Sequence, residues 1–366
     1  MNILFIINAF SIGGAEKLVC NLALQLRSMV QGISVIGLYQ ANPQVQENLR
    51  QKLEENGIKT YVLNKRAGKD RVNSVRQICH IIKKDKISVL HGHCSVPMLL
   101  GKIAGFLTHT PVVCTVHNTR NYSAIRELLT SWMSAAYVSI GTAAEQYMLA
   151  ELHISPHKIC RIDNAVNVQY LQNSKKIATF WQQYGGTEGD VNLINIGRVH
   201  PQKNQLCMLR AMKELKEQGC TNYQLYIIGP YSQTDALYQK LMLFTQTNHL
   251  EKQVHFLGLT THVADFIANA DCFLMTSHYE GLSLAFLEAV IGGLPVISTD
   301  LPFVRNLRKI APCALLIGQN DSHALAEMLK NKEFLKFTAP KELFAKHFSI
   351  ENCAQRHLEL YQQVSI

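Results

Sequence analysis

The stretch NILFIINAFSIGGAEKLVCNLALQLRSM, residues 2–29, begins with an apolar run, passes two glycines and ends in a helical pattern. The run Ile3–Asn8 has the length and composition of a buried strand, and Ala15–Met29 has the spacing of a helix. At Gly13 and Gly14, between them, the backbone can approach a ligand closely, and the helix N-terminus favours negative charge. A tight turn that simply requires glycine explains the pair equally well. The third glycine of a dinucleotide fingerprint is missing, which disfavours nicotinamide binding.

The same alternation of strand-like runs and helical patterns continues along the chain. Further strands are expected at Ile33–Tyr39, Lys59–Leu63, Val89–His91, Val112–His117, Tyr137–Ile140, Leu193–Gly197, Gln224–Gly229, Val254–Leu257, Cys272–Met275 and Pro295–Ser298. Helices are expected at Arg71–Lys84, Gln205–Gln218, Asp235–Asn248, Ser283–Ile291 and Ile350–Val364, with Val72, Val75, Ile78, Cys79 and Ile82 forming the apolar face of the first. The order predicts an α/β chain with two Rossmann-like, doubly wound domains.

The domain boundaries follow from where this pattern stops and restarts. We predict an N-terminal domain over 1–167 and a second domain over 191–348. The polar segment 168–190, which contains Gly185, Gly186 and Gly189, is expected to be the interdomain linker. A last helical segment, 349–366, begins with Ser349 as a good N-cap.

Composition restricts the class of protein and its compartment. The chain has 366 residues, of which 47% are hydrophobic, enough for two cores. Its longest apolar runs fall far below the roughly 20 residues of a membrane span, and the first residues lack the features of a secretory signal. The ten cysteines are spaced singly, as free thiols in a reducing compartment would be. We therefore expect a cytoplasmic protein.

Positive charge is concentrated in the first half of the chain. The net charge is +9, and Lys59–Lys86 alone holds nine basic and two acidic residues. Such an excess favours an anionic partner such as lipid headgroups, phosphates or nucleic acid. A merely solvated basic face is the alternative.

Two motifs in the second half carry the chemistry. In Asn195–Asn204, a strand ends at Gly197, and Arg198 and Lys203 follow next to a helix start, an arrangement that suits a diphosphate. In Ser277–Glu288, Glu280 precedes a helix and Glu288 lies about two turns inside it. Between them, the backbone N–H groups of Gly281, Leu282, Ser283 and Leu284 can point at an anion. Taken alone, Arg198 and Lys203 could be solvated loop residues. Glu280 could be an exposed turn residue, and Glu288 an ordinary acidic residue of a helix.

Together the motifs resemble those of the retaining family 4 glycosyltransferases, which have the glycosyltransferase B fold. Glu280 and Glu288 match the E-x7-E signature, and Gly197, Arg198 and Lys203 match the glycine-Arg and the following Lys. The other matches are the Gly-Gly-Ala-Glu at Gly13–Glu16, the Thr-Val-His-Asn at Thr115–Asn118 and the closing helix at Phe348–Tyr361. The matches are scattered over almost the whole chain in the expected order.

The resemblance implies a function and a role for each matched residue. The chain would move a hexosyl or N-acetylhexosaminyl group from a nucleotide diphosphate sugar to a glycan or lipid-linked acceptor, with retention, in bacterial surface polysaccharide, lipopolysaccharide or glycolipid synthesis. Its two domains would face each other across a cleft, the first binding acceptor and the second donor, with 349–366 crossing back to the first. Arg198 and Lys203 would hold the diphosphate, joined by Gly14. Glu288 would bind the ribose.

The remaining implied roles concern the reacting end of the donor. Glu280, with the amides of Leu282, Ser283 and Leu284 beside Gly281, would position the sugar and its phosphates, and His117 would lie near the reacting centre. By the family's analogy no metal or other cofactor is required. The sequence departs from the family pattern at three places. Asp163-Asn164-Ala165 stands where the family has Pro-Asn-Gly, and Asp300 is not followed by the usual Gly-Gly pair. Asn306 stands where a Glu is common.

Other interpretations remain open beside this one. A nicotinamide-dependent oxidoreductase is disfavoured by the incomplete glycine fingerprint. A non-enzymatic nucleotide- or membrane-binding protein would not need to keep both carboxylates, both cations and His117. We expect no nucleic-acid partner, whereas the basic segment Lys59–Lys86 suggests peripheral docking on the inner face of an anionic membrane. His91 and His93 are expected to line or pack the cleft, and Trp132 and Trp181 to be packing residues.

Overall fold

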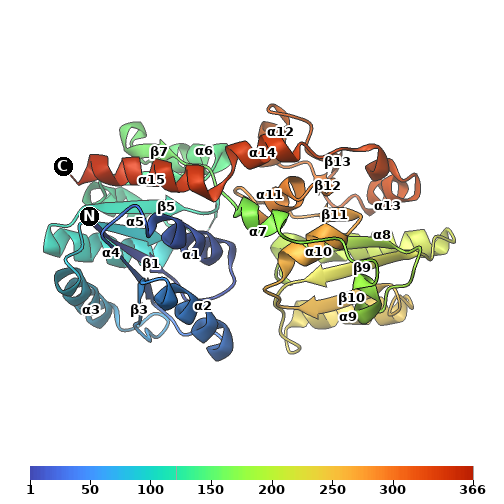
Figure 1. Cartoon of the computed structure of the whole chain (residues 1–366), viewed down its shortest axis with the longest axis horizontal. Helices are drawn as coiled ribbons and strands as arrows, with labels where there is room; N and C mark the ends of the chain where they lie inside the picture. The colour runs from blue at the N-terminus through green and yellow to red at the C-terminus, as the bar shows by residue number, and fades with distance from the viewer. Residues whose placement is uncertain (121, 366) are drawn as a thin grey trace. The chain divides into compact units, whose positions relative to one another are not determined.

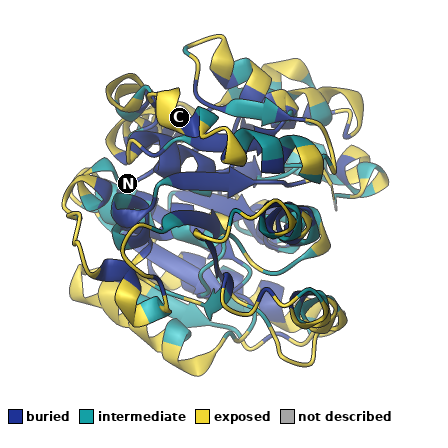
Figure 2. Cartoon of the chain, turned by 90° about the vertical axis from the view of Figure 1, so that its right-hand side faces the viewer, coloured by how far each residue is buried: buried dark blue, intermediate teal, exposed yellow. Residues whose placement is uncertain are grey.

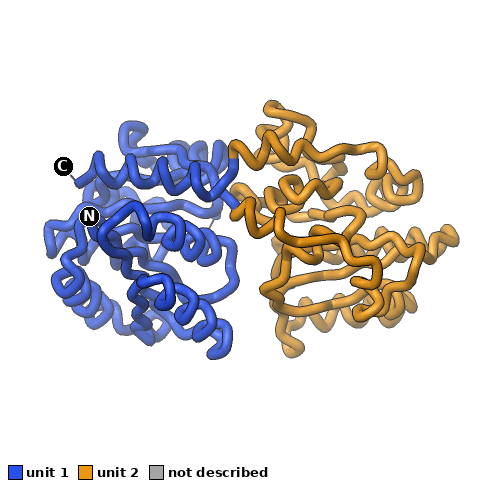
Figure 3. Tube along the Cα trace, viewed as in Figure 1, with its two compact units in different colours: residues 1–166, 348–366 blue, residues 167–347 orange. Residues whose placement is uncertain are grey.

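The computed structural model describes residues 1–120 and 122–365, which form two compact units. Unit 1 comprises Met1–Val166 and the returning segment that starts at Phe348, and unit 2 comprises Asn167–His347 (Figure 3). Within the described residues, no helix is both long and apolar enough to cross a membrane.

Unit 1 is built on one parallel sheet with helices between successive strands (Figure 1). Its strands are β1 (Asn2–Ile7), β2 (Gly32–Gly37), β3 (Lys59–Val62), β4 (Val89–His93), β5 (Val112–Val116), β6 (Ala136–Ser139) and β7 (Ile159–Arg161). Its helices are α1 (Gly14–Leu26), α2 (Pro43–Glu55), α3 (Arg71–Lys84), α4 (Ser95–Thr108), α5 (Ala124–Thr130), α6 (Thr142–Ala150) and α15 (Ile350–Val364).

Unit 2 repeats this architecture with its own parallel sheet. Its strands are β8 (Val191–Ile196), β9 (Tyr223–Ile228), β10 (Val254–Gly258), β11 (Cys272–Met275), β12 (Val296–Thr299) and β13 (Leu315–Ile317). Its helices are α7 (Val168–Gln172), α8 (Gln205–Glu217), α9 (Ala236–Thr247), α10 (Val263–Asn269), α11 (Leu284–Ile291), α12 (Pro302–Arg308), α13 (Ser322–Lys330) and α14 (Lys341–His347).

Both sheets reverse their strand order once, as a doubly wound fold requires. The orders are β3-β2-β1-β4-β5-β6-β7 in unit 1 and β10-β9-β8-β11-β12-β13 in unit 2. Because crossover connections are right-handed, the reversal places helices on both faces of each sheet. The strands are therefore buried while the helices keep exposed outer faces (Figure 2). The predicted α/β class with two Rossmann-like units is confirmed.

The predicted linker is where the domain boundaries need correction. Residues 168–190 belong to unit 2, because the 3₁₀ segment η3 (Phe180–Tyr184) packs into its core. The Trp181 ring stacks on Tyr226 at 4.2 Å between centroids, and its Nε1 donates to the Asn269 carbonyl at 2.7 Å. The boundary therefore falls after Val166, and Trp181 is the packing residue that we expected.

Two further predictions about the elements were wrong. Strands β7 and β13 were missed, because each is only three residues long at a sheet edge and is too short to show a period. On α3, Val72 is 67% exposed, while Ser74 and Ile81 are buried in its place.

Helix α15 returns to unit 1 and packs there against a buried group of histidines. Ser349 caps it as predicted, its side chain accepting from Asn352 N. The His91 Nδ1 lies 2.6 Å from the Tyr361 hydroxyl of α15, and the rings of His91 and His357 lie 5.5 Å apart. The His357 Nδ1 lies 2.8 Å from the Cys353 carbonyl. Because a carbonyl oxygen can only accept, the nitrogen donates this hydrogen bond. These contacts join the last helix to strand β4.

Burial keeps these imidazoles neutral. It lowers the pKa of His357 to about 4, and it lowers the pKa values of His91 and His93 well below their ordinary range. Repulsion among the histidines themselves acts in the same direction. His117, next to the cluster, has its pKa lowered to about 3 by burial and then by His357.

We predict that unit 1 loses stability as the pH falls below about 6.5, the pKa of an unfolded histidine. Between that value and the lowered folded pKa values, the unfolded chain binds more protons, so each histidine removes up to about 1.4 kcal/mol of stability per pH unit. Thermal unfolding between about pH 5 and 7.5 measures the effect above the carboxylate range. The slope should be smaller in His357→Gln and unchanged in the exposed control His157→Gln. Equal slopes in both variants and the parent would contradict this account.

Candidate functional site

The two chemical motifs of unit 2 lie at the point where its sheet reverses. Strands β8 and β11 are direct neighbours, with Leu193 paired with Cys272. The loop with Arg198 and Lys203 follows β8, and the loop with Glu280 follows β11. Both loops therefore emerge at the carboxyl edge of the sheet at its switch point, where doubly wound folds bind ligands.

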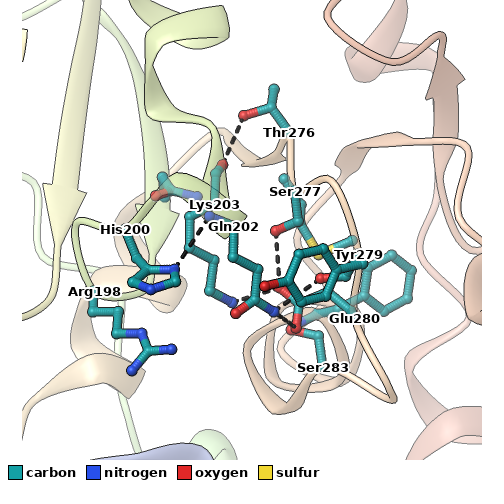
Figure 4. A network of polar contacts seen from close by, with 12 residues as sticks. Arg198, His200, Gln202, Lys203, Thr276, Ser277, Tyr279, Glu280 and Ser283 are labelled. Atoms are coloured by element: carbon teal, nitrogen blue, oxygen red, sulfur yellow. Dashed lines mark hydrogen bonds and ion pairs between the residues drawn. The ribbon is translucent and has the colours of Figure 1, made fainter. Parts of the chain in front are cut away.

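A polar network joins these two loops through Lys203 and Glu280 (Figure 4). The Lys203 Nζ lies 2.6 Å from Glu280 Oε1, with side-chain exposures of 16% and 10%. The same oxygen accepts from Ser277 Oγ at 2.8 Å. Gln202 Nε2 donates to the Tyr279 carbonyl at 2.9 Å and lies 3.3 Å from Glu280 Oε2. The ammonium and the carboxylate are thus fixed beside each other.

Backbone contacts hold the loops at the distance that this network needs. Thr276 Oγ1 donates to the Asn204 carbonyl at 2.9 Å, and His278 N donates to the Gln202 carbonyl at 2.8 Å. Gly197 matters here, because a Cβ at this position would lie 3.0 Å from Lys203 Cε. The lysine stem therefore passes directly over the glycine that ends β8.

The second cation, Arg198, is exposed, and Figure 4 shows its guanidinium outside the drawn network. Its carbonyl accepts from Gln205 Nε2 at 2.9 Å, which fixes the backbone while the side chain projects outward. The pKa of His200 is sensitive to the charge of this loop. Burial lowers this pKa most, and the positive charges of Arg198 and Lys203 lower it further. The loop is therefore electropositive and suited to an anion.

Helix α11 begins beside the network with its N-terminus formed as predicted. Ser283 is the N-cap, and its hydroxyl accepts from Phe286 N at 3.4 Å. The first N–H groups of a helix have no partner inside it, so the turn from Gly281 to Leu284 presents positive backbone dipoles. Glu288 follows within α11 and is only 4% exposed. A buried carboxylate of this kind can accept from hydroxyl groups.

The two remaining predicted residues belong to unit 1. Gly14 is the first residue of α1 and is exposed after the N-cap Gly13. His117 follows β5, and its Nε2 lies 2.9 Å from His93 Nδ1. Its lowered pKa keeps the ring neutral at physiological pH, so it can donate or accept a hydrogen bond but carries no charge.

Several partners in these networks escaped the sequence prediction. Gln202 and Ser277 touch Glu280, and His93 touches His117, yet the sequence analysis gave none of the three a role in binding or catalysis. Proximity to the motifs was the available signal, since Gln202 directly precedes Lys203 and Ser277 lies three residues before Glu280.

Metal ligands are not gathered anywhere in the part of the chain that the structure describes: no group of three or more His, Cys, Asp or Glu side chains could hold an ion. His91 and His93 instead pack in the core of unit 1. At the departures from the family pattern, Asp300 pairs with Arg305 at 2.7 Å, and Asn306 lies in α12.

Two family models and several relatives of similar sequence identify glycosyltransferases as the proteins that this chain resembles. The model for Glycosyltransferase Family 4 matches residues 12–170, and the model for Glycosyl transferases group 1 matches residues 190–331. A galactosyltransferase of Escherichia coli, UDP-Gal:alpha-D-GlcNAc-diphosphoundecaprenol alpha-1,3-galactosyltransferase, is 27% identical over 68% of this chain and 67% of its own. The N-acetyl-alpha-D-glucosaminyl L-malate synthase of Bacillus anthracis is 20% identical over 79% and 78%.

Solved structures agree with this at the level of the fold. Anabaena HepE, crystallised with UDP and glucose, has a TM-score of 0.84 at 17% identity and covers 99% of both chains. A glycosyltransferase of Rickettsia africae has a TM-score of 0.85 at 18% identity, covering 99% of this chain and 98% of its own. With both units matched by consecutive models and the two motifs joined at the switch point of unit 2, the chain belongs to the group 1, family 4 glycosyltransferases and has the glycosyltransferase B fold.

Proposed function

We propose that this glycosyltransferase moves a hexosyl or N-acetylhexosaminyl group from a nucleoside diphosphate sugar to a glycan or lipid-linked acceptor, with retention of configuration. The observation that carries the proposal is the Lys203–Glu280 pair at the switch point of unit 2, next to the N-terminus of α11. Breaking the bond between sugar and diphosphate adds negative charge to the departing diphosphate, and the cations and dipoles that can stabilise this charge already converge there.

In this proposal the diphosphate lies over the loop after β8. Lys203 and Arg198 supply positive charge, and the first turn of α11 supplies backbone N–H groups. Gln202 and Ser277 prevent the Glu280 carboxylate from turning away. The leaving group is neutralised by the chain's own groups, so no metal ion is required.

The two carboxylates have separate tasks in the donor site. Glu280 lies 2.6 Å from the lysine ammonium, so a sugar hydroxyl bound to it lies next to the diphosphate that Lys203 holds. Glu288, deeper in α11, binds the ribose hydroxyls. For unit 1 the proposal keeps the roles that the family resemblance implies, diphosphate binding for Gly14 and a place near the reacting centre for neutral His117.

The relatives support a donor and a type of pathway. HepE has been crystallised with UDP-glucose, and the E. coli relative uses UDP-Gal and a diphosphoundecaprenol-linked sugar. Other relatives are named for colanic acid or capsular polysaccharide biosynthesis. We place the present chain in the synthesis of bacterial surface polysaccharide, lipopolysaccharide or glycolipid, acting from the cytoplasmic side.

The basic segment Lys59–Lys86 is proposed to attract unit 1 to an anionic membrane or to a lipid-linked acceptor. Its two acids are already paired, Asp70 with Arg66 and Asp85 with Lys59. Lys65 must be left out of the docking set, because it is buried and its Nζ donates to two backbone carbonyls. Outside these two ion pairs, the exposed cations of the segment are Lys69, Arg71, Arg76, Lys83, Lys84 and Lys86.

Arg198→Ala and Lys203→Ala should each weaken nucleoside diphosphate binding by about 2 to 5 kcal/mol, the typical loss when one partner of a desolvated charge pair is removed. Transfer should slow in parallel. Lys213→Ala, which removes an exposed lysine of the same unit paired with Glu217, is the matched control. Isothermal calorimetry and initial rates measure both quantities. Unchanged kinetics in both site variants would remove the diphosphate assignment.

Glu288→Gln and Glu280→Gln should differ in what they impair. Since Glu288 is assigned to the ribose, its variant should lose affinity for free UDP by roughly tenfold, the equivalent of one or two hydrogen bonds. The Glu280 variant should keep most of that affinity and lose turnover. Calorimetry with UDP, followed by kinetics with UDP-sugars, separates the two. A larger loss of UDP affinity in the Glu280 variant would reverse the assignment.

Neutralising Lys69, Arg71, Arg76 and Lys84 to glutamine should reduce binding to vesicles that contain anionic lipid. Each cation near such a surface contributes about 1 kcal/mol, screened over a Debye length of roughly 8 Å at physiological salt. Co-sedimentation should therefore rise with the anionic fraction and fall with salt. Replacing Lys240, Lys252, Lys309 and Lys336 of unit 2 provides a control of equal charge. Binding that ignores lipid charge, salt and these substitutions would make the segment a solubility feature.

A further inference from the structure

Helix α5 has its acidic residue inside and its large apolar residues outside. Glu127 is 1% exposed, whereas Ile125, Leu128 and Leu129 are 74%, 63% and 65% exposed. A surface helix of a soluble protein has the opposite arrangement, with an apolar stripe that faces the core. The hydrophobic effect within this chain therefore does not explain how α5 is oriented.

A buried polar network holds α5 in this orientation. The Glu127 carboxylate pairs with Lys102 of α4, and both side chains are almost fully buried. Glu127 also accepts from the Tyr137 hydroxyl at 2.8 Å, and Lys102 donates to Thr130 Oγ1 at 3.1 Å. Turning the helix to bury its leucines would expose Glu127 and leave the Lys102 ammonium buried without its partner, which is strongly unfavourable. The exposure of the apolar side chains is thus a fixed feature of the unit.

Neighbouring elements extend the exposed apolar surface. Phe106 and Leu107 at the end of α4 and Trp132 in η1 (Ser131–Met133) are 51%, 60% and 59% exposed. Their contacts make the surface continuous with α5: the Phe106 and Trp132 rings lie 5.3 Å apart, and Trp132 Nε1 donates to the Leu129 carbonyl at 2.9 Å. Trp132, which we expected to be a packing residue, is therefore largely exposed. The six residues Phe106, Leu107, Ile125, Leu128, Leu129 and Trp132 are called the α5 face below.

The solvent-accessible charged side chains near this face are positive. Between Ile87 and Ala144 the sequence contains a single acidic residue, the buried Glu127. Arg126 lies on α5 itself with its side chain 25% exposed. Lys158 donates to the carbonyls of Ser131 and Ser134 at 3.0 and 2.8 Å, next to Trp132. The α4, α5 and η1 segments thus offer no exposed carboxylate, and two cations, Arg126 and Lys158, lie beside their apolar side chains.

We infer that the α5 face is the surface by which unit 1 enters the interfacial layer of an anionic lipid bilayer. Contiguous exposed apolar patches mark interaction sites, and tryptophan with flanking cations suits the boundary between headgroups and acyl chains. A second copy of the chain is a poorer occupant. A two-fold contact through this face would bring cations against cations with no carboxylate to pair with them.

This inference deepens the proposed function, on which it rests for the lipid-linked acceptor. Docking through the α5 face would hold unit 1, the proposed acceptor unit, at the layer where a lipid-linked acceptor has its polar group. It differs physically from the attraction of Lys59–Lys86, because apolar burial survives salt whereas charge attraction is screened.

The test compares Ile125→Gln/Leu128→Gln/Leu129→Gln with the control Leu243→Gln/Leu335→Gln, whose two leucines in unit 2 are equally exposed at 63% each. Vesicles containing phosphatidylglycerol are used at low salt and again at about 0.5 M salt, where the Debye length is only a few ångströms. We expect the triple variant to lose binding by roughly tenfold or more at both salt concentrations, and the control to bind like the parent chain. Equal binding of the triple variant and the parent at high salt would overturn the inference.

Trp132 supplies a second readout without any added probe. The chain has two tryptophans, and Trp181 is buried in unit 2. Vesicles should shift the emission to the blue and allow quenching by brominated acyl chains, and both effects should vanish in Trp132→Phe. An emission spectrum that vesicles do not change would overturn the inference, as would a dimer in ultracentrifugation that disappears in the triple variant.

UDP binding by calorimetry keeps the two proposals apart. The triple variant should bind UDP as the parent does, because its substitutions lie outside unit 2. Vesicle binding without any nucleotide binding in the parent would refute the donor assignment and leave the α5 face in place.

Discussion

The side-by-side pairing of β8 and β11 is the constraint on which the donor site depends. These strands are far apart in sequence, and only the reversal of the sheet between them brings the loops of Lys203 and Glu280 to the same edge. The 2.6 Å ion pair then follows from two short loops of fixed length. Gly197 belongs to the same constraint, because any side chain there would displace the lysine stem. The arrangement of charged groups at this edge of the sheet therefore depends on the strand order as much as on the motif residues.

Unit 1 uses buried polarity in two different ways. The histidines under α15 are neutral and serve as partners in packing, with His91 bridging Tyr361 and Thr115 at 2.6 Å each. The Lys102–Glu127 pair is charged, and it specifies which way α5 faces. Burying an ion pair adds little stability by itself, but it penalises every arrangement that separates the partners. Such a pair is a means of keeping leucines in contact with solvent.

Sequence reasoning found the fold and the chemical motifs because both depend on local patterns. The periodicity of Arg71–Lys84 and Ile350–Val364 predicted these helices with their observed bounds, and Ser349 was recognised as a cap. The three-residue edge strands escaped because so short a run has no measurable period. Residues 168–190 were predicted to be a linker because most of them are polar. The stacking of Trp181 on a ring of unit 2 could not be recognised from that composition. The inverted burial on α5 could not be foreseen, since it depends on Lys102 meeting Glu127 from another helix.

The return of α15 to unit 1 has a consequence for how the chain is made. Val166 N donates to the Phe348 carbonyl at 2.9 Å and Ile350 N to the Val166 carbonyl at 3.0 Å, so the chain leaves unit 1 and re-enters it at one place. Everything in unit 2 is synthesised between these two points. On the ribosome, therefore, the second unit can reach its final packing while the first still lacks the helix that covers His91 and His93. The unit that starts the sequence is the last to be completed.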